Sequence, residues 1–522
     1  MSSWSLRLES LSDRLNPVAV KELRQIAEGR FILFLLLGLV GAESLFVGGT
    51  LLTNSSGQTV AVGRVAFSFL YGILSLSCLL LVPAYIGWRL AAERYGKEMD
   101  LIYITAISPR HIVSGKLLSA VALTTLIFST FLPFLALTYY LRGVDLSSIF
   151  GLLVFSFVTV VMATLGAIVL GALPVSRGMK VFLSGGVLLF LLQFAGLGFV
   201  AIISVVGRGG TGGFALAALT GGLMSAPPGG TGTLRVWLHI LFLIAGLSIV
   251  ALLLFQIAVA ILTPAAANRS RGFRLSLAVC WLLCGAGAVS LTVVYSSAFY
   301  IMFWCILFSL VLAAAFFTAV SERHRFGSRI VRGVPARGWR RWKAFLLSSG
   351  AASALLFYLA MGMLTLLVTF LVYAFGFGDN DIRDSVEISA GLMMYGLGYS
   401  LIGLLILRSL PKGRLHSKRS GLIGLGVLVL ASIGPLTLGA LLAPEAYWNT
   451  ETGFRNFLMG NPIALMFDSH RGAYLVLGLV LSAGGLLGNA GWLFDQFESF
   501  RPPPATLKRA SDTSAGKVEA HG

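Results

Sequence analysis

Charged residues that could do chemistry concentrate in two segments of the chain, and one further acid stands alone. The segment 88–116 carries carboxylates and cations together, Glu93 and Asp100 among them, and the segment 16–30 repeats that mixture. Glu43 is the only acid well inside a long apolar run. A zinc protease would need His-Glu-x-x-His, and a metal site would need clustered Cys or His; neither pattern occurs. These residue types favour ion pairing and recognition, so we predict no catalytic residue and no metal ligand.

The sequence also lacks the pattern of a phosphate-binding loop. The P-loop motif is Gly-x-x-x-x-Gly-Lys followed by Ser or Thr. The nearest segment, Ser114-Gly115-Lys116-Leu117, lacks the first Gly and the final hydroxyl. The Gly-rich segment 207–233 follows no strand and is interpreted as a loop. The chain is therefore predicted not to be an enzyme and to bind no cofactor itself.

The apolar composition indicates which elements must position the charged segments. Of the 522 residues, 57% are hydrophobic and 11% are charged, whereas a soluble domain carries about 25% charged residues. Apolar runs of about 20 residues recur, and a helix of that length crosses the hydrocarbon core of a membrane. The runs are continuous rather than alternating, which favours helices over a β-barrel. The sequence therefore predicts an all-α polytopic membrane protein.

About twelve transmembrane helices are predicted. The predicted spans are 31–52, 65–87, 117–140, 148–173, 181–206, 236–263, 275–296, 299–320, 344–375, 387–407, 421–443 and 471–494. They divide into two six-span units, 31–274 and 275–494, because in each unit the largest cytoplasmic loop lies between the second and third spans. Residues 1–30 precede the first unit, and residues 495–522 are expected to form a disordered cytoplasmic tail.

The basic residues behind the net charge of +18 are concentrated in the predicted loops and are not spread over the whole chain. The segment 321–343 is the clearest case, because Glu322 is its only acid. Its basic residues are Arg323, Arg325, Arg329, Arg332, Arg337, Arg340, Arg341 and Lys343. This bias follows the positive-inside rule and predicts a multi-pass protein of the bacterial inner membrane with both termini in the cytoplasm. It favours contact with membrane lipid over binding of nucleic acid.

Both charged segments are predicted to form surface helices. Asn16 is a good N-cap and Pro17 suits a first helical turn, so residues 1–30 are expected to contain an amphipathic helix that runs into the first span. In the segment 88–116 we expect one helix from about Ala91, a break at Ser108-Pro109, and a second helix that enters the third span. A short helix with charges of both signs suits docking of a soluble partner.

Together the two segments resemble ABC transporter permeases of the ABC-2 type. The resemblance lies between positions 16 and 120. Its residues are the helix Asn16-Pro17…Glu22-Leu23-Arg24 and the loop Glu93-Arg94…Gly96…Asp100-Leu101…Thr105…Ser108-Pro109-Arg110…Gly115-Lys116. Asn461-Pro462, before the last span, is similar to an element that many members carry there.

In that family the loop after the second span is a coupling helix, which docks on a separate ATP-binding subunit. The resemblance implies an exporter permease whose ATP and Mg²⁺ are held by that partner. It implies that the docking residues are Glu93, Arg94, Asp100, Thr105, Ser108 and Pro109. It also implies that Asn16, Pro17, Glu22 and Arg24 belong to the connecting helix.

Other functions stay open on the sequence alone. A proton-coupled secondary carrier is also built from twelve spans, and a non-transporting membrane scaffold needs no further motif. Glu43 is a candidate intramembrane polar site, although such an acid can also snorkel or bond to a neighbouring hydroxyl. The substrate, and the pairing of this permease with a second copy or with another permease, are left open.

Overall fold

The computed structural model is helical, with no strand among the residues that it describes. Those residues are 16–53, 59–95, 107–140, 146–173, 184–185, 231–264, 267–295, 297–322, 326–335, 338–376, 380–410, 419–442, 459–466 and 471–501. Eight helices in this part of the chain are long and apolar enough to cross a membrane, or nine if one bent pair counts as a span. This is the architecture of an α-helical multi-pass membrane protein.

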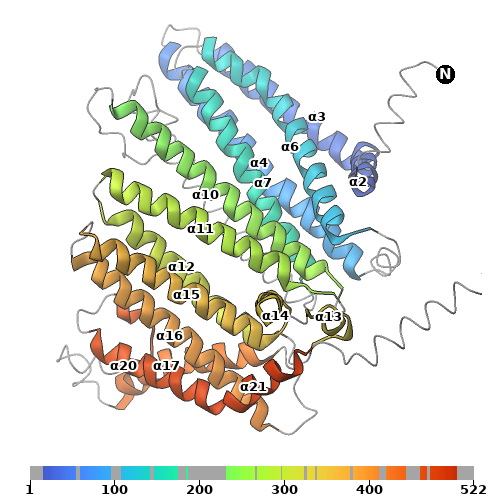
Figure 1. The fold of residues 1–522 in the computed structure, drawn as a ribbon. Coiled ribbons are helices and arrows are strands. Elements are labelled where there is room, and N and C mark those ends of the chain that lie inside the picture. Colours follow the sequence, from blue (N-terminus) through green and yellow to red (C-terminus); the bar gives the residue numbers. More distant parts are fainter. Residues whose placement is uncertain are drawn as a thin grey trace, which may run out of the picture. The chain divides into compact units, whose positions relative to one another are not determined.

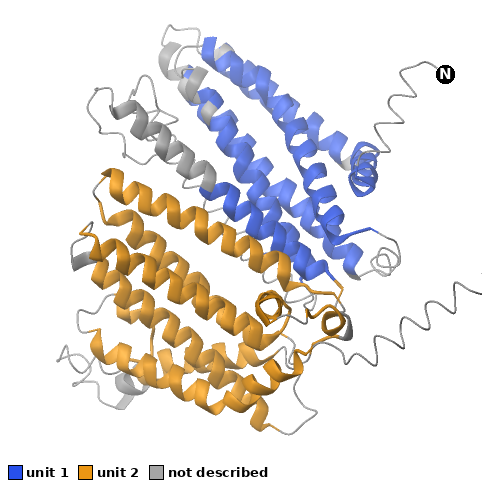
Figure 2. Ribbon diagram, viewed as in Figure 1, with its two compact units in different colours: residues 1–263 blue, residues 264–522 orange. Residues whose placement is uncertain are grey.

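The chain forms two compact units, residues 1–263 and 264–522, which differ in colour in Figure 2. The boundary falls at Pro264, just after a long helix, rather than after the Arg274 expected from the sequence. Unit 1 consists of α2 (Pro17–Ala27), α3 (Arg30–Thr53), α4 (Thr59–Tyr95), α6 (Pro109–Tyr140), α7 (Leu146–Ala172) and α10 (Thr231–Leu262), as Figure 1 shows. The predicted span 181–206 lies outside the described residues, apart from positions 184 and 185.

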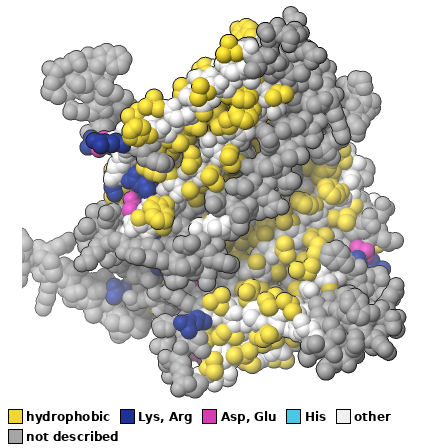
Figure 3. Space-filling view, turned by 180° about the vertical axis from the view of Figure 1, so that it is seen from behind, with side chains coloured by type: hydrophobic (Ala, Val, Ile, Leu, Met, Phe, Trp, Pro, Cys, Tyr) yellow, Lys and Arg dark blue, Asp and Glu magenta, His cyan; other side chains and the backbone are white. Residues whose placement is uncertain are grey.

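The core of unit 1 is built on α4. Phe67, Leu70, Leu74, Cys78 and Val82 are buried and recur every three or four residues, so they form one face of that helix. This face packs against α6 and α7, while α10 packs against α7 and α6. The outer flanks of the helices are apolar too, and in Figure 3 hydrophobic side chains cover the visible helix faces while coloured charged side chains lie near their edges. Such flanks suit contact with lipid.

Unit 2 is organised around α16 (Asn380–Ser409). Its other elements are α11 (Ser270–Tyr295), α12 (Phe299–Val320), α13 (Ser328–Arg332), α14 (Gly338–Leu346), α15 (Ala351–Ala374), α17 (Ser420–Leu442), η2 (Ala464–Met466), α20 (Gly472–Gly488) and α21 (Ala490–Ser499). α16 packs against α12, α15, α17 and α20. A Cβ at Gly396 would lie 2.8 Å from the Cα of Ala313 on α12, so only glycine permits this approach.

Three expectations for unit 2 are corrected by the structure. The predicted span 344–375 is divided, because α14 ends at Leu346 and α15 begins at Ala351. The predicted span 471–494 bends by 53° between α20 and α21. Asn489 lies at this bend and donates hydrogen bonds from Nδ2 to the carbonyl oxygens of Leu401 (3.1 Å) and Gly485 (2.9 Å). The first residues of the predicted tail are ordered, because α21 continues to Ser499 and Phe500 is buried, and residues 502–522 lie outside the described part of the chain.

Candidate functional site

The helix predicted within residues 1–30 forms as α2, and it is attached to the start of α6. The side chain of Asn16 accepts a hydrogen bond from the backbone N–H of Val18 at 3.0 Å, which caps α2, and Pro17 takes the first helical position. Asn16 Nδ2 also donates to the carbonyl oxygen of His111 at 2.5 Å and to Ser114 Oγ at 3.0 Å. In Figure 1 α2 is seen end-on while α4 and α6 run across the view, so α2 lies crosswise to them.

A group of charged side chains joins α2, α4 and α6, and we call Lys21, Glu22, Arg89, Glu93 and Lys116 the unit 1 charge cluster. Lys116 Nζ lies 2.7 Å from Glu22 Oε1 and 2.9 Å from Glu93 Oε2. The side chains of Lys116 and Glu22 are each 1% exposed, and that of Glu93 is 11% exposed. Arg89 Nε lies 3.5 Å from Glu22 Oε2, and Lys21 Nζ lies 3.6 Å from Glu93 Oε1. The buried charges therefore compensate one another within the chain.

Glycine at position 115 lets α2 approach α6 closely enough for these ion pairs. A Cβ built on Gly115 would lie 2.8 Å from the Cβ of Val18 and 3.0 Å from the backbone nitrogen of Ala19. Any larger residue would push α2 away from α6. The Gly115-Lys116 pair thus combines a close contact with the central cation of the charge cluster.

The predicted docking residues Glu93 and Arg94 face the chain's own helices. The start of the helix expected from about Ala91 belongs to α4, which continues without a break to Tyr95, and the rest of it, 96–106, lies outside the described residues. The Glu93 carboxylate is engaged by Lys116 and Lys21, and Arg94 donates a hydrogen bond to the carbonyl oxygen of Ala172. These contacts hold the end of α4 against its neighbours within unit 1.

Of the other predicted site residues, some lie in the described part of the chain and some lie outside it. Ser108-Pro109 marks the start of α6 as expected: the backbone N–H of His111 donates to the carbonyl oxygen of Ser108 at 2.9 Å, and Pro109 opens the helix. Arg24 is exposed in the last turn of α2. Asp100 and Thr105 lie outside the described residues. The charge cluster therefore holds the two helix ends that the segment 96–106 connects.

Glu43 lies on the inner face of α3. It follows Leu36 and Leu39 and precedes Val47 at helical spacing, and all three of these apolar side chains belong to or pack against the core of unit 1. Glu43 is 0% exposed, and neither carboxyl oxygen has a hydrogen-bond partner among the described residues. Burial of such a group without a partner is costly, so Glu43 is retained at the expense of stability.

We expect Glu43→Leu to raise the free energy of unfolding by about 1–3 kcal/mol, the range over which an unpaired buried polar group destabilises a protein. Leucine fills a similar volume and matches the apolar face of α3. The check is thermal unfolding in detergent beside Glu43→Gln, which keeps a polar group and is expected to bring no gain. A lower stability of the Leu variant would mean that the carboxyl has a partner.

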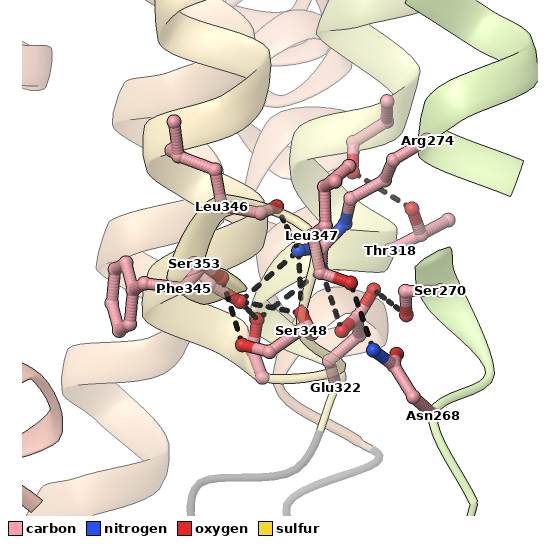
Figure 4. A network of polar contacts seen from close by, with 12 residues as sticks. Asn268, Ser270, Arg274, Thr318, Glu322, Phe345, Leu346, Leu347, Ser348 and Ser353 are labelled. Carbon is pink, nitrogen blue, oxygen red and sulfur yellow. Dashed lines mark hydrogen bonds and ion pairs between the residues drawn. The ribbon is translucent and has the colours of Figure 1, made fainter. Parts of the chain in front are cut away.

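A second buried cation organises unit 2 and was missed by the sequence analysis. The Arg274 side chain, near the start of α11, is 0% exposed and lies 2.9 Å from Glu322 Oε2. Its guanidinium donates to the carbonyl oxygens of Leu346 (2.8 Å) and Ser348 (2.6 Å), as Figure 4 shows. Ser270 Oγ donates to Glu322 Oε1 at 3.0 Å. Arg274 thus ties α11 and the end of α12 to the turn between α14 and α15.

Two signals in the sequence point to this contact. Glu322 is the only acid in a strongly basic segment, and Arg274 is the last charged residue before the apolar run of α11. Burial raises the pKa of the Glu322 carboxyl, while the charge of Arg274 and the hydrogen bond from Ser270 oppose that rise. The positive-inside rule treats every Arg of a loop alike, so it does not distinguish the buried Arg274 from exposed arginines.

Neither polar network resembles a metal centre. Among the described residues, no group of three or more His, Cys, Asp or Glu could hold a metal ion. Cys78, Cys280, Cys284 and Cys305 are thiols that take part in no disulfide bond. Comparison of the chain with models of protein families, with curated proteins and with solved structures finds no match.

Proposed function

We propose that this chain is the membrane-spanning permease subunit of an ATP-driven exporter, similar to the ABC-2 type, in which a separate subunit binds and hydrolyses ATP. The proposal includes twelve spans in two six-span units, with both termini in the cytoplasm of a bacterium. It is supported by the resemblance of residues 16–120 and by the eight apolar helices of the described part of the chain. The substrate is not part of the proposal.

The observation that carries the proposal is the unit 1 charge cluster. It joins α2, the end of α4 and the start of α6, and the segment 96–106 connects those two helix ends. Buried ion pairs resist separation because an unpaired buried charge costs several kcal/mol. A displacement of the segment 96–106 would therefore move α2, α4 and α6 together. An ATP-driven permease needs such a rigid link between its coupling segment and its spans.

In this mechanism the residues of the segment 96–106 contact the partner, and those of the unit 1 charge cluster transmit its motion. The partner would contact the segment that contains Asp100 and Thr105, and its motion on ATP hydrolysis would displace that segment. Glu93, Lys116 and Glu22 would transmit the displacement, because they hold the three helices in one arrangement. The spans would then open a path for the substrate on alternate sides of the membrane or laterally.

Glu43 favours a second candidate function. A buried acid inside a span without a partner among the described residues is typical of sites that bind protons or cations during transport. A proton-coupled secondary carrier would use such a residue and would need no ATP-binding partner. Loss of proton-driven uptake in Glu43→Gln, with no ATPase associated, would favour this function.

The decisive experiment isolates the tagged chain from its native membrane and tests for a co-purifying ATPase. We expect Asp100→Lys to reduce the recovered ATPase about tenfold or more, which corresponds to about 1.4 kcal/mol of binding free energy. Glu498→Lys is the matched control, because Glu498 is an exposed acid at the end of α21. It is expected to leave the recovery unchanged.

Two results would contradict the permease proposal. One is the absence of any ATPase from the wild-type sample under conditions that preserve known transporter complexes. The other is equal recovery with Asp100→Lys and with Glu498→Lys. Glu93→Lys is unsuitable as a docking variant, because it would place a second cation beside Lys116 and disrupt the charge cluster.

A further inference from the structure

The short helix α14 combines exposed aromatic rings with a basic face. In α14, Trp339 is 72% exposed and Trp342 is 46% exposed, while Phe345 is buried. Arg340 and Lys343 are exposed, and Lys343 Nζ lies 5.3 Å from the centre of the Trp339 ring. The helix contains no acid. It therefore has an apolar edge next to a cationic face, and part of that edge is uncovered.

One side of α14 is fixed by an aromatic cluster with α21. The ring of Phe345 lies 5.5 Å from that of Phe497, 5.3 Å from that of Phe500 and 6.1 Å from that of Phe326. Arg341 Nε donates a hydrogen bond to the carbonyl oxygen of Phe500 at 2.8 Å. Burial of these rings stabilises the attachment of α14 to α21.

The end of α14 is fixed by the buried guanidinium of Arg274. Its hydrogen bonds go to the carbonyl oxygens of Leu346 and Ser348, the residues that end α14 and begin the turn to α15 (Figure 4). Carbonyl groups at a helix end lack intrahelical donors, and that of Ser348 also accepts from Ser353 Oγ at 2.7 Å. The exposure of Trp339 is thus a property of a firmly held helix rather than of a loose loop.

The position of α14 matches the surface of a membrane. It lies between the end of one apolar helix, α12, and the start of another, α15. In Figure 1 α14 is viewed end-on, whereas α12, α15 and α16 run across the picture, so α14 lies crosswise to them. A helix in this orientation lies in the plane of the headgroups, where Trp is enriched and Lys and Arg meet lipid phosphates.

We propose that the outer face of α14, formed by Trp339, Arg340, Trp342 and Lys343, binds anionic phospholipid of the adjacent leaflet. The Trp339 ring enters the boundary between headgroups and acyl chains. The exposed part of Trp342, whose ring centre lies 4.7 Å from that of Phe497, borders the same boundary, and the two exposed cations contact the headgroup phosphates. A soluble partner of acidic surface would need the cations but not the exposed Trp339. The proposal is independent of the ATP-driven transport proposed above.

The test titrates the purified full-length chain in uncharged detergent with phosphatidylglycerol or phosphatidylcholine that carries brominated acyl chains, and follows quenching of tryptophan fluorescence. The difference between the wild type and Trp339→Phe isolates the signal of Trp339. We expect that signal to be quenched at much lower concentrations of phosphatidylglycerol than of phosphatidylcholine. Arg340→Gln and Lys343→Gln should each weaken the phosphatidylglycerol effect about fivefold, since each cation near an anionic surface contributes about 1 kcal/mol.

The same chain offers matched control variants for both the ring and the cations. Trp88→Phe removes a ring that is 76% exposed on α4, and Arg383→Gln removes an exposed cation at the start of α16. Both should leave the preference of Trp339 for phosphatidylglycerol unchanged. Equal quenching by both lipids, or an undiminished preference in Arg340→Gln/Lys343→Gln, would overturn the proposal. Displacement of the lipid by free glycerol phosphate at equal phosphate concentration would also overturn it, because the site would then bind phosphate and not a lipid surface.

Discussion

Lys116→Met is expected to lower the free energy of unfolding by about 3–5 kcal/mol, the usual cost of removing one partner from a buried ion pair. Two carboxylates, those of Glu22 and Glu93, would be left without their central cation at 1% and 11% exposure. Their mutual repulsion adds to the cost of burial. The loss can be followed by the reaction of Cys78 with a thiol-specific dye during heating, because this buried thiol lies in the core of unit 1.

Two further variants define how the charge cluster stabilises unit 1. Lys21→Met removes a cation whose side chain is 47% exposed, so it is expected to cost only about 0–1 kcal/mol. The combined variant Glu22→Gln/Glu93→Gln/Lys116→Met removes the buried charges together and is expected to regain most of the stability lost in Lys116→Met. If the combined variant were as unstable as Lys116→Met, the methylene chain of Lys116 rather than its charge would be important.

Arg274→Met is expected to cost a similar amount, about 3–5 kcal/mol, because it removes the buried ion pair with Glu322 and the hydrogen bonds of the guanidinium to the carbonyl oxygens of Leu346 and Ser348. The guanidinium bridges α11, the end of α12 and that turn, so its loss should loosen all three. The buried thiol of Cys280, six residues after Arg274 on α11, reports on this region. It should become reactive at a lower temperature than in the wild type.

Arg383→Met is the matched control for Arg274→Met. Arg383 also pairs with a glutamate, Glu387, but its side chain is 69% exposed, so the expected cost is about 0–1 kcal/mol. Arg274→Lys tests the geometry, because a single ammonium cannot reach the carbonyl oxygens and the carboxylate that the planar guanidinium bonds together. Full stability of Arg274→Lys would contradict the assigned hydrogen-bond network.

Much of the helical framework could be predicted from hydropathy. Eleven of the twelve predicted spans fall on helices, and the remaining span, 181–206, lies outside the described residues apart from 184 and 185. Hydropathy failed where a short surface helix adjoins a span, since α14 and α15 are both apolar in part and only the turn at 347–350 separates them. It also failed at Asn489, where a hydrogen bond to Leu401 on another helix accompanies the bend.

The sequence by itself determined that this protein consists of long apolar helices with charged segments at their ends, because the length and continuity of apolar runs are local properties. It also determined the cap at Asn16 and the break at Ser108-Pro109, since both depend on neighbouring residues. Only the tertiary structure decided that Glu93 faces inward. Glu22 and Lys116, which are 94 positions apart, meet because helix packing at Gly115 brings them together. Local periodicity reports which face of a helix is polar, but the partner of a buried charge is chosen by which helices pack against that face.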